Sequence, residues 1–166
     1  IINNKLKYLK NKKKFKKSKI NVYFKHTNIK KIVGGKLDYC MCAISGLEGL
    51  SPTLNAIKSS KVVGVANKES IICAWNLIEK NLNKYKTKFI PIDSEHFSIW
   101  SLLKGSSKKN VEKIFITASG GPFLNTNKKN LKKVTPKLAI KHPNWNMGKK
   151  ISIDSATLMN KVFEVV

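Results

Sequence analysis

The sequence contains no arginine, although 33 of its 166 residues carry a basic side chain of the lysine or arginine type. All 33 are therefore lysine, and with only nine acidic residues the formal net charge is +24. Proteins that bind nucleic acid usually include arginine, because its planar guanidinium group contacts phosphates and base edges through paired hydrogen bonds. We therefore expect no nucleic-acid partner. The excess of lysine keeps a lysine-rich nucleic-acid-binding module as an alternative.

Cysteine and long apolar runs are also scarce. The three cysteines form no CxxC pair, which favours free thiols in a reducing compartment. Cys40 and Cys42 alternate within a strand-like run, so both are expected on one face, packed in a core. No apolar run reaches the roughly 18 residues that span a bilayer, so no membrane association is expected. The chain starts at Ile1 and stops at Val166 inside a helix-like stretch, and we interpret it as an internal fragment of a longer protein.

The middle of the chain alternates between strand-like and helix-like segments. Strands are predicted at 38–45, 61–66 and 88–92. A first helix is expected to start at Ser51, with Pro52 at its first position. A second helix is expected to start in the sequence "NKES" at 67–70; its apolar stripe comprises Ile71, Trp75, Ile78, Leu82 and Tyr85. Alternating strands and helices predict a parallel α/β sheet.

Two of the nine carboxylates, Asp93 and Glu95, directly follow the last of these strands. Buried carboxylates are costly unless they are paired, hydrogen-bonded or bound to a metal ion. One explanation is that Asp93 or Ser94 caps a helix. Ligands of parallel sheets, however, bind beyond the carboxyl ends of the strands, where both "NKES" and "DSEH" lie. The pattern therefore indicates a binding site.

The remaining third of the chain offers further polar groups. A strand is predicted at 111–118, followed by a Ser-Gly-Gly turn at 119–121 that could bind an anion through its backbone N–H groups. A short helix is expected to open at Thr135 and Pro136. A final helix is expected from about Ala156, capped by Asp154 or Ser155. Its polar face would carry Thr157, Asn160, Lys161 and Glu164, and either a site or a solvated surface explains that face equally well.

Five stretches together resemble the 1-deoxy-D-xylulose 5-phosphate reductoisomerase family. They are "ANKES" at 66–70, "PIDSEH" at 91–96, "SGGPF" at 119–123, "HPNWNMGKKISIDSATLMNK" at 142–161, and Glu164. The resemblance implies that residues 1–90 are the second half of a Rossmann-like NADPH-binding domain with a parallel sheet. Residues 91–166 would then begin an α+β catalytic domain, with the C-terminal helical domain missing. The fragment by itself is expected to be inactive.

The resemblance also implies site residues. Asp93, Glu95 and Glu164 would hold Mg²⁺ or Mn²⁺, with Co²⁺ as a further option. The substrate phosphate would be bound by Ser119, His142, Ser155, Asn160 and Lys161. Ser94 and Lys68 would contact the reacting end of the substrate, beside Glu95 and Glu164. Lys68, Glu95 and His142 would have catalytic roles, and Asn67, Glu69 and Gly148 would contact NADPH. Trp145 and Met147 would lie on a loop that closes over the site.

The implied activity is the rearrangement and NADPH-dependent reduction of 1-deoxy-D-xylulose 5-phosphate to 2-C-methyl-D-erythritol 4-phosphate, in isoprenoid biosynthesis. The full-length enzyme is expected to be a homodimer, in the bacterial cytoplasm or, in a eukaryote, the plastid stroma. Val162 and Phe163 depart from the family, which usually has glycine and leucine there. We expect Val162 to crowd the site, so an inactive or degenerate homologue is the main alternative.

Overall fold

The computed structural model describes residues 5–24 and 29–166 of the chain. The chain divides into two compact units, Ile1–Pro91 and Ile92–Val166. The described residues of the first unit form three strands, and the second unit, all of whose backbone is described, contains none. Within the described part of the chain, no helix combines the length and the apolar character needed to cross a membrane.

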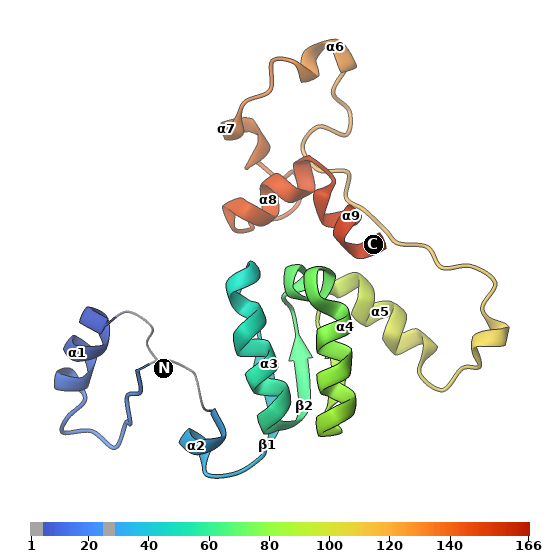
Figure 1. Ribbon diagram of the computed structural model, residues 1–166. Helices are drawn as coiled ribbons and strands as arrows, with labels where there is room; N and C mark the ends of the chain where they lie inside the picture. Colours follow the sequence, from blue (N-terminus) through green and yellow to red (C-terminus); the bar gives the residue numbers. More distant parts are fainter. Residues whose placement is uncertain (1–4, 25–28) are drawn as a thin grey trace. The chain divides into compact units, whose positions relative to one another are not determined.

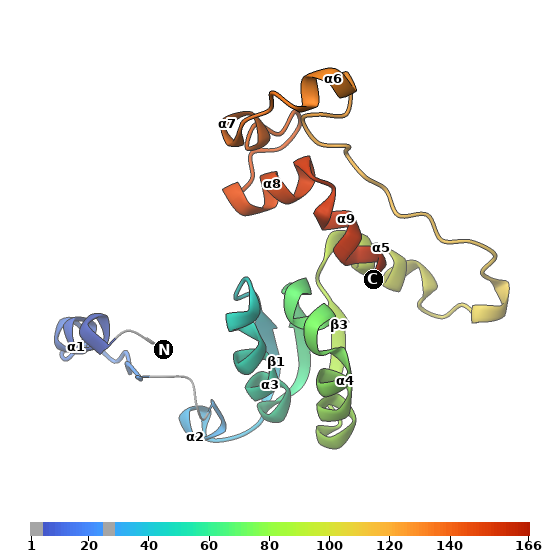
Figure 2. The same ribbon diagram turned by 45° about the horizontal axis from the view of Figure 1, so that its top comes forward.

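A three-stranded parallel sheet forms the centre of the first unit. Its strands are β1 (Leu37–Cys42), β2 (Ser60–Val65) and β3 (Lys88–Pro91), in the order β1-β2-β3. Two crossover helices, α3 (Leu50–Ser59) and α4 (Lys68–Tyr85), connect the strands and cover the same face of the sheet (Figures 1 and 2). The predicted parallel α/β sheet is thus confirmed. Three further elements precede α3, namely α1 (Lys5–Lys14), α2 (Ile29–Val33) and the 3₁₀ turn η1 (Leu47–Gly49).

The core of this unit lies between the sheet and the two crossover helices. Val63 and Val65 of the central strand pack with Ile57 of α3 and Ile78 of α4, and all four are fully buried. Cys42 belongs to the same core and Cys40 packs against it, as predicted for two thiols on one face of a strand. Burial raises the pKa of the Cys42 thiol to about 11, so this thiol stays protonated.

The two crossover helices begin differently from each other. The α4 helix begins as predicted: Asn67 caps it and its side chain accepts a hydrogen bond from the backbone N–H of Ser70. The predicted Ser51 cap of α3 is wrong, because α3 already begins at Leu50 after Gly49. A Cβ atom on Gly49 would collide with the Asn67 amide and the Ile44 carbonyl. The chain before α3 therefore packs closely against Asn67 at the start of α4.

The apolar stripe predicted along α4 is confirmed at four of its five positions. Ile78 and Leu82 are buried, and Ile71 and Tyr85 pack against the core. Trp75, by contrast, is partly exposed and meets Phe89 edge-on, with 5.6 Å between the ring centroids. Ala74 has non-helical dihedral angles (φ −145°, ψ 31°), so the helix is distorted immediately before Trp75. Ideal helical spacing therefore does not apply there.

The second unit consists of helices joined by extended chain. Its elements are α5 (Ser94–Leu103), η2 (Lys108–Asn110), α6 (Lys128–Leu131), α7 (Pro136–Ala139), α8 (Lys149–Ala156) and α9 (Met159–Val165). The predicted short helix forms as α7, with Thr135 as N-cap and Pro136 first. The strand predicted at 111–118 does not form, and Phe115 within it is 83% exposed. A strand needs a hydrogen-bonded neighbour, and the second unit offers no strand to pair with it.

The single helix predicted from about Ala156 is also wrong, because the chain forms two helices there. Asp154 and Ser155 lie in the last turn of α8 instead of capping a helix, and Leu158 has a left-handed conformation (φ 60°). A left-handed residue other than glycine costs about 1–2 kcal/mol. The turn is stabilised by hydrogen bonds from Leu158 N–H to the Ser155 carbonyl and from Lys161 N–H to the Leu158 carbonyl.

Candidate metal centre

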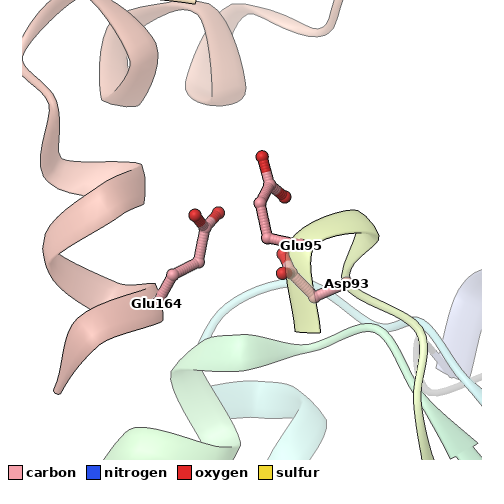
Figure 3. Close-up of side chains that lie close together, drawn as sticks. All are labelled: Asp93, Glu95 and Glu164. Atoms are coloured by element: carbon pink, nitrogen blue, oxygen red, sulfur yellow. The ribbon is translucent and has the colours of Figure 1, made fainter. Parts of the chain in front are cut away.

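Three carboxylates of the second unit converge on one point. Asp93 precedes α5, Glu95 lies in the first turn of α5, and Glu164 reaches toward both from α9 (Figure 3). One oxygen atom from each lies within 4.8 Å of the others. The exposed fractions of these side chains are 9% for Asp93, 21% for Glu95 and 0% for Glu164. Such burial is costly without a compensating cation or hydrogen bonds.

Asp93 also caps α5. Its Oδ1 atom accepts a hydrogen bond from the backbone N–H of His96, at 3.2 Å. A carboxylate has two oxygens with several lone pairs, so an N-cap bond leaves acceptor capacity for a metal ion. The role of Asp93 as the N-cap of α5 is therefore compatible with a role of the same carboxylate in a binding site.

His96 on α5 forms a hydrogen bond to α9, the helix that carries Glu164. Its Nε2 atom lies 2.8 Å from the backbone carbonyl of Glu164, and its Nδ1 atom lies 3.4 Å from Oδ1 of Asp93. Because a carbonyl can only accept, Nε2 carries the proton of that hydrogen bond. This role could not be predicted from the sequence, because the two bonded residues are 68 positions apart.

Lys161 places its ammonium group inside the carboxylate cluster. The Nζ atom lies 2.5 Å from Oε1 of Glu95 and 2.5 Å from Oε2 of Glu164. Burial alone would raise the pKa of Glu95, but hydrogen bonds from Lys161, Ser94 and the backbone outweigh it and hold that pKa below its ordinary value. Burial alone would lower the pKa of Lys161, but its bonds to Glu164 and Glu95 hold it above its ordinary value. Both groups are therefore charged near neutral pH.

The donor set fits a hard divalent cation. Mg²⁺ and Mn²⁺ prefer oxygen ligands, and sites that bind substrates usually employ few protein carboxylates so that coordination positions remain open. Three formal negative charges meet one ammonium here, which leaves two negative charges to be balanced. The cluster thus has the charge and the ligand chemistry that such an ion requires.

A second polar cluster joins three residues that are distant in sequence. The Ser119 hydroxyl lies 2.9 Å from Nε2 of His142 and 3.4 Å from the Ser155 hydroxyl. Nδ1 of His142 accepts the backbone N–H groups of Asn144 and Trp145, at 3.2 and 3.1 Å. In the neutral ring Nε2 therefore carries the proton and donates it to Ser119. Two hydroxyls and an imidazole N–H together can bind an anion such as a phosphate.

Gly121 allows the Ser-Gly-Gly turn to approach α8. Its φ angle is +66°, and a Cβ atom there would lie 2.7 Å from the Ser155 carbonyl oxygen and 3.1 Å from the Ala156 Cα atom. The turn thus has the unusual backbone angles expected from its glycines. This approach brings Ser119 next to Ser155.

The other residues singled out from the sequence are distributed over both units. Ser94 lies at the carboxylate cluster and donates to Oε2 of Glu95, at 2.5 Å. Asn160 is half-buried on α9, and Gly148 precedes α8. Val162 is 48% exposed, so the expected crowding of the site is not found. Trp145 is exposed on the loop before α8, and Met147 is half-buried there.

Lys68, Asn67 and Glu69 lie in the first unit, at the start of α4 and beyond the carboxyl end of β2. The Asn67 side chain is buried. Its amide donates to the carbonyls of Ile44 and Gly46 while its oxygen caps α4. These bonds occupy the Asn67 side chain.

Comparison with known proteins gives consistent matches along the chain. The family model of 1-deoxy-D-xylulose 5-phosphate reductoisomerase matches residues 1–75, and the model of the C-terminal domain of the same enzyme matches residues 89–166. The 1-deoxy-D-xylulose 5-phosphate reductoisomerase of Pelagibacter ubique (strain HTCC1062) is 59% identical over 156 residues, which are 93% of this chain and 40% of that protein. The chain therefore spans about two fifths of the length of this relative.

Solved structures agree with the sequence matches. The enzyme of Zymomonas mobilis in complex with NADPH has a TM-score of 0.85 at 36% identity, over 99% of this chain and 42% of that one. A DOX-P reductoisomerase in complex with NADPH, fosmidomycin and magnesium has a TM-score of 0.82 at 34% identity, over 98% of this chain and 43% of that one. The motifs, the fold and these matches agree: the chain belongs to the 1-deoxy-D-xylulose 5-phosphate reductoisomerase family.

Proposed function

We propose that this chain is part of an enzyme that converts 1-deoxy-D-xylulose 5-phosphate to 2-C-methyl-D-erythritol 4-phosphate, using NADPH and a divalent metal ion. The observation that carries the proposal is the convergence of Asp93, Glu95 and Glu164 within 4.8 Å. Further support comes from the relatives, which carry the name of this activity, and from similar structures in complex with NADPH and magnesium. The second half of an NADPH-binding domain would comprise residues 1–90, and residues 91–166 would begin the catalytic domain.

Asp93, Glu95 and Glu164 would hold Mg²⁺ or Mn²⁺, with Co²⁺ as a further option. When bound, the ion would polarise the substrate carbonyl and orient the neighbouring hydroxyl. Ser94 donates to Glu95 in this structure and would turn its hydroxyl to the substrate. His96 would act as a positioning residue, because it bonds the backbone of Glu164 and the carboxylate of Asp93.

The substrate phosphate would bind at the Ser119–His142–Ser155 cluster. All three side chains can donate a hydrogen bond to an anion, and His142 is oriented for this by two backbone N–H groups. Asn160 and Lys161 on α9 would complete the phosphate site. The loop with Trp145 and Met147 would close over the bound sugar and exclude water from the reactive aldehyde.

NADPH would contact Asn67, Glu69 and Gly148, and Lys68 would contact the reacting end of the substrate. Asn67 to Glu69 lie beyond the carboxyl end of a central parallel strand, where ligands of such sheets bind. The complete enzyme would be a homodimer located in the bacterial cytoplasm or, in a eukaryote, in the plastid stroma.

The test compares Glu95→Gln and Glu164→Gln with Glu112→Gln in the complete enzyme. Glu112 is an exposed carboxylate of the same unit, so it controls for the chemistry of the substitution. Removing a residue that only hydrogen-bonds to a metal ligand lowers metal affinity or activity about 10–100-fold. Removing a ligand itself should therefore lower turnover by more than about a hundredfold. At 100-fold excess over Kd, Mn²⁺ should stabilise the wild type by about 2.7 kcal/mol. The two ligand variants should lose most of this stabilisation, and Glu112→Gln should keep it.

Substrate-dependent NADPH oxidation and thermal unfolding with and without Mn²⁺ provide the two readouts. An equal Mn²⁺ shift in all four proteins would show that these carboxylates are not the ligands. A wild type that binds Mn²⁺ and NADPH without oxidising NADPH would instead identify a degenerate homologue.

A further inference from the structure

Lys161 already supplies the carboxylate cluster with a cation. Its ammonium lies 2.5 Å from an oxygen of Glu95 and 2.5 Å from an oxygen of Glu164. The Glu164 side chain is fully buried and that of Lys161 is 20% exposed, so solvent screens this contact only partly. This is a hydrogen-bonded ion pair inside the site proposed for a metal ion.

The ammonium and a metal ion would require the same space. Mg²⁺ lies about 2.0–2.1 Å from its oxygen ligands. An ion bound to Glu95 and Glu164 would therefore enter the position of the Lys161 ammonium or lie against it. Two cations at that separation repel strongly in a partly buried site. Occupation by the ion thus requires Lys161 to leave.

The cluster proposed to bind the substrate phosphate lies in the same unit as Lys161. The Ser119–His142–Ser155 cluster offers hydrogen-bond donors to an anion, and Ser155 lies at the end of α8, just before the turn that leads into α9 and Lys161. A flexible lysine stem suits movement between two anionic partners, because the ammonium is a compact point charge on rotatable bonds.

We propose that Lys161 is an exchangeable counter-ion, which occupies the carboxylate cluster in the metal-free enzyme and is displaced by the metal ion to bind the substrate phosphate. The proposal rests on the function proposed above and adds to it the order in which the metal ion and the substrate phosphate bind. Metal binding releases the lysine and thereby prepares the phosphate site. The metal-free enzyme binds sugar phosphate poorly because its phosphate cation is held elsewhere.

The first measurement is Mn²⁺ affinity of the complete enzyme without substrate, followed through the electron paramagnetic resonance signal of free Mn²⁺. Lys161→Met keeps the length of the side chain and removes its charge. It should bind Mn²⁺ at least about tenfold more tightly than the wild type, since no ammonium must be displaced. Lys150→Met is the matched control, because Lys150 pairs with Asp154 on α8 at 2.7 Å. Its Mn²⁺ affinity should stay within about twofold of the wild type.

The second measurement separates displacement from simple charge repulsion. The wild type is acetylated briefly with and without Mn²⁺, and the modification of each lysine is quantified by mass spectrometry. Mn²⁺ should increase the labelling of Lys161 severalfold and leave the labelling of Lys150 unchanged. Repulsion without displacement would tighten Mn²⁺ binding in Lys161→Met but would not increase labelling.

The outcomes distinguish this inference from the proposed function. If the wild type binds Mn²⁺ while Lys161→Met binds it no more tightly, or if the labelling of Lys161 does not rise, the exchange is refuted and the metal site stands. If neither protein binds Mn²⁺, the metal site and the exchange both fail.

Discussion

Gly121→Ala tests whether the Ser-Gly-Gly turn positions the phosphate ligands. Gly121 has a φ angle of +66°, and an added Cβ atom would lie 2.7 Å from the Ser155 carbonyl oxygen and 3.0 Å from its carbonyl carbon. These neighbours are backbone atoms, so neither can rotate away. The turn and the end of α8 would have to separate by several tenths of an ångström, which moves Ser119 away from Ser155.

The expected magnitude follows from two contributions. A left-handed conformation costs an alanine about 1–2 kcal/mol relative to glycine. Misplacing one or two donors weakens hydrogen bonds to a charged phosphate, each worth about 1.5–3 kcal/mol. The KM for the sugar phosphate should therefore rise about tenfold to a hundredfold. The KM for NADPH should stay within about twofold, because the turn contacts Ser155 and Ala156 at the C-terminal end of α8, whereas Gly148 lies at its N-terminal end.

Gly120→Ala is the matched control for backbone strain. Gly120 also has a positive φ angle (+76°), but the atoms nearest to its added Cβ atom belong to the side chain of Leu124, which can rotate away. Both variants should lower the unfolding temperature, whereas only Gly121→Ala should raise the KM for the sugar phosphate strongly. Steady-state kinetics and thermal unfolding of the complete enzyme measure both effects. Equal KM values in the two variants would refute the positioning role.

Two further predictions concern stability. Because the pKa of Glu95 is lower in the folded chain than its ordinary value, Glu95 contributes stability that is fully present above about pH 4.5 and is lost as the pH falls through the folded pKa. Chelator-treated Glu95→Gln should therefore lose less stability than the wild type as the pH falls below about 4.5, and parallel acid-unfolding curves would contradict this. Leu158→Gly should raise the free energy of unfolding by up to about 1 kcal/mol, because glycine adopts the left-handed conformation of Leu158 (φ 60°) without strain. Denaturant unfolding measures this effect, and a marked destabilisation would show that the partly exposed Leu158 side chain contributes more than its backbone strain costs.

The parallel sheet could be predicted from the sequence, because the patterns that indicate its strands and helices are local. Short β-branched runs alternate with helical spacing, and both the Asn67 cap and the Thr135-Pro136 start depend on neighbouring residues alone. The prediction failed where distant contacts decide. The helix predicted to start at Ser51 begins at Leu50, directly after Gly49, which lies close to the distant Asn67. The strand predicted at 111–118 has no neighbouring strand with which to pair.

The same contrast between local patterns and distant contacts applies to the candidate site. Its carboxylates, hydroxyls and histidine could be named from their motifs, but the roles of His96 and Lys161 depend on contacts between residues 66 to 68 positions apart. The break at Leu158 was also invisible, since an apolar residue in a helical pattern gives no sign of a left-handed conformation. That break sets the direction of α9, and with it the position of Glu164.

Charge explains why a chain with a net charge of +24 can still hold a divalent cation. At physiological ionic strength, exposed charges farther away than about 8 Å are largely screened, so the many surface lysines count for little at the site. Within that distance, three carboxylates carry three formal negative charges, of which the Lys161 ammonium balances one. A divalent ion in the place of the ammonium would balance two of these charges, so it would be the stronger partner for the carboxylates. The displaced lysine would then be available to a phosphate, which would couple metal binding to substrate binding through a single side chain.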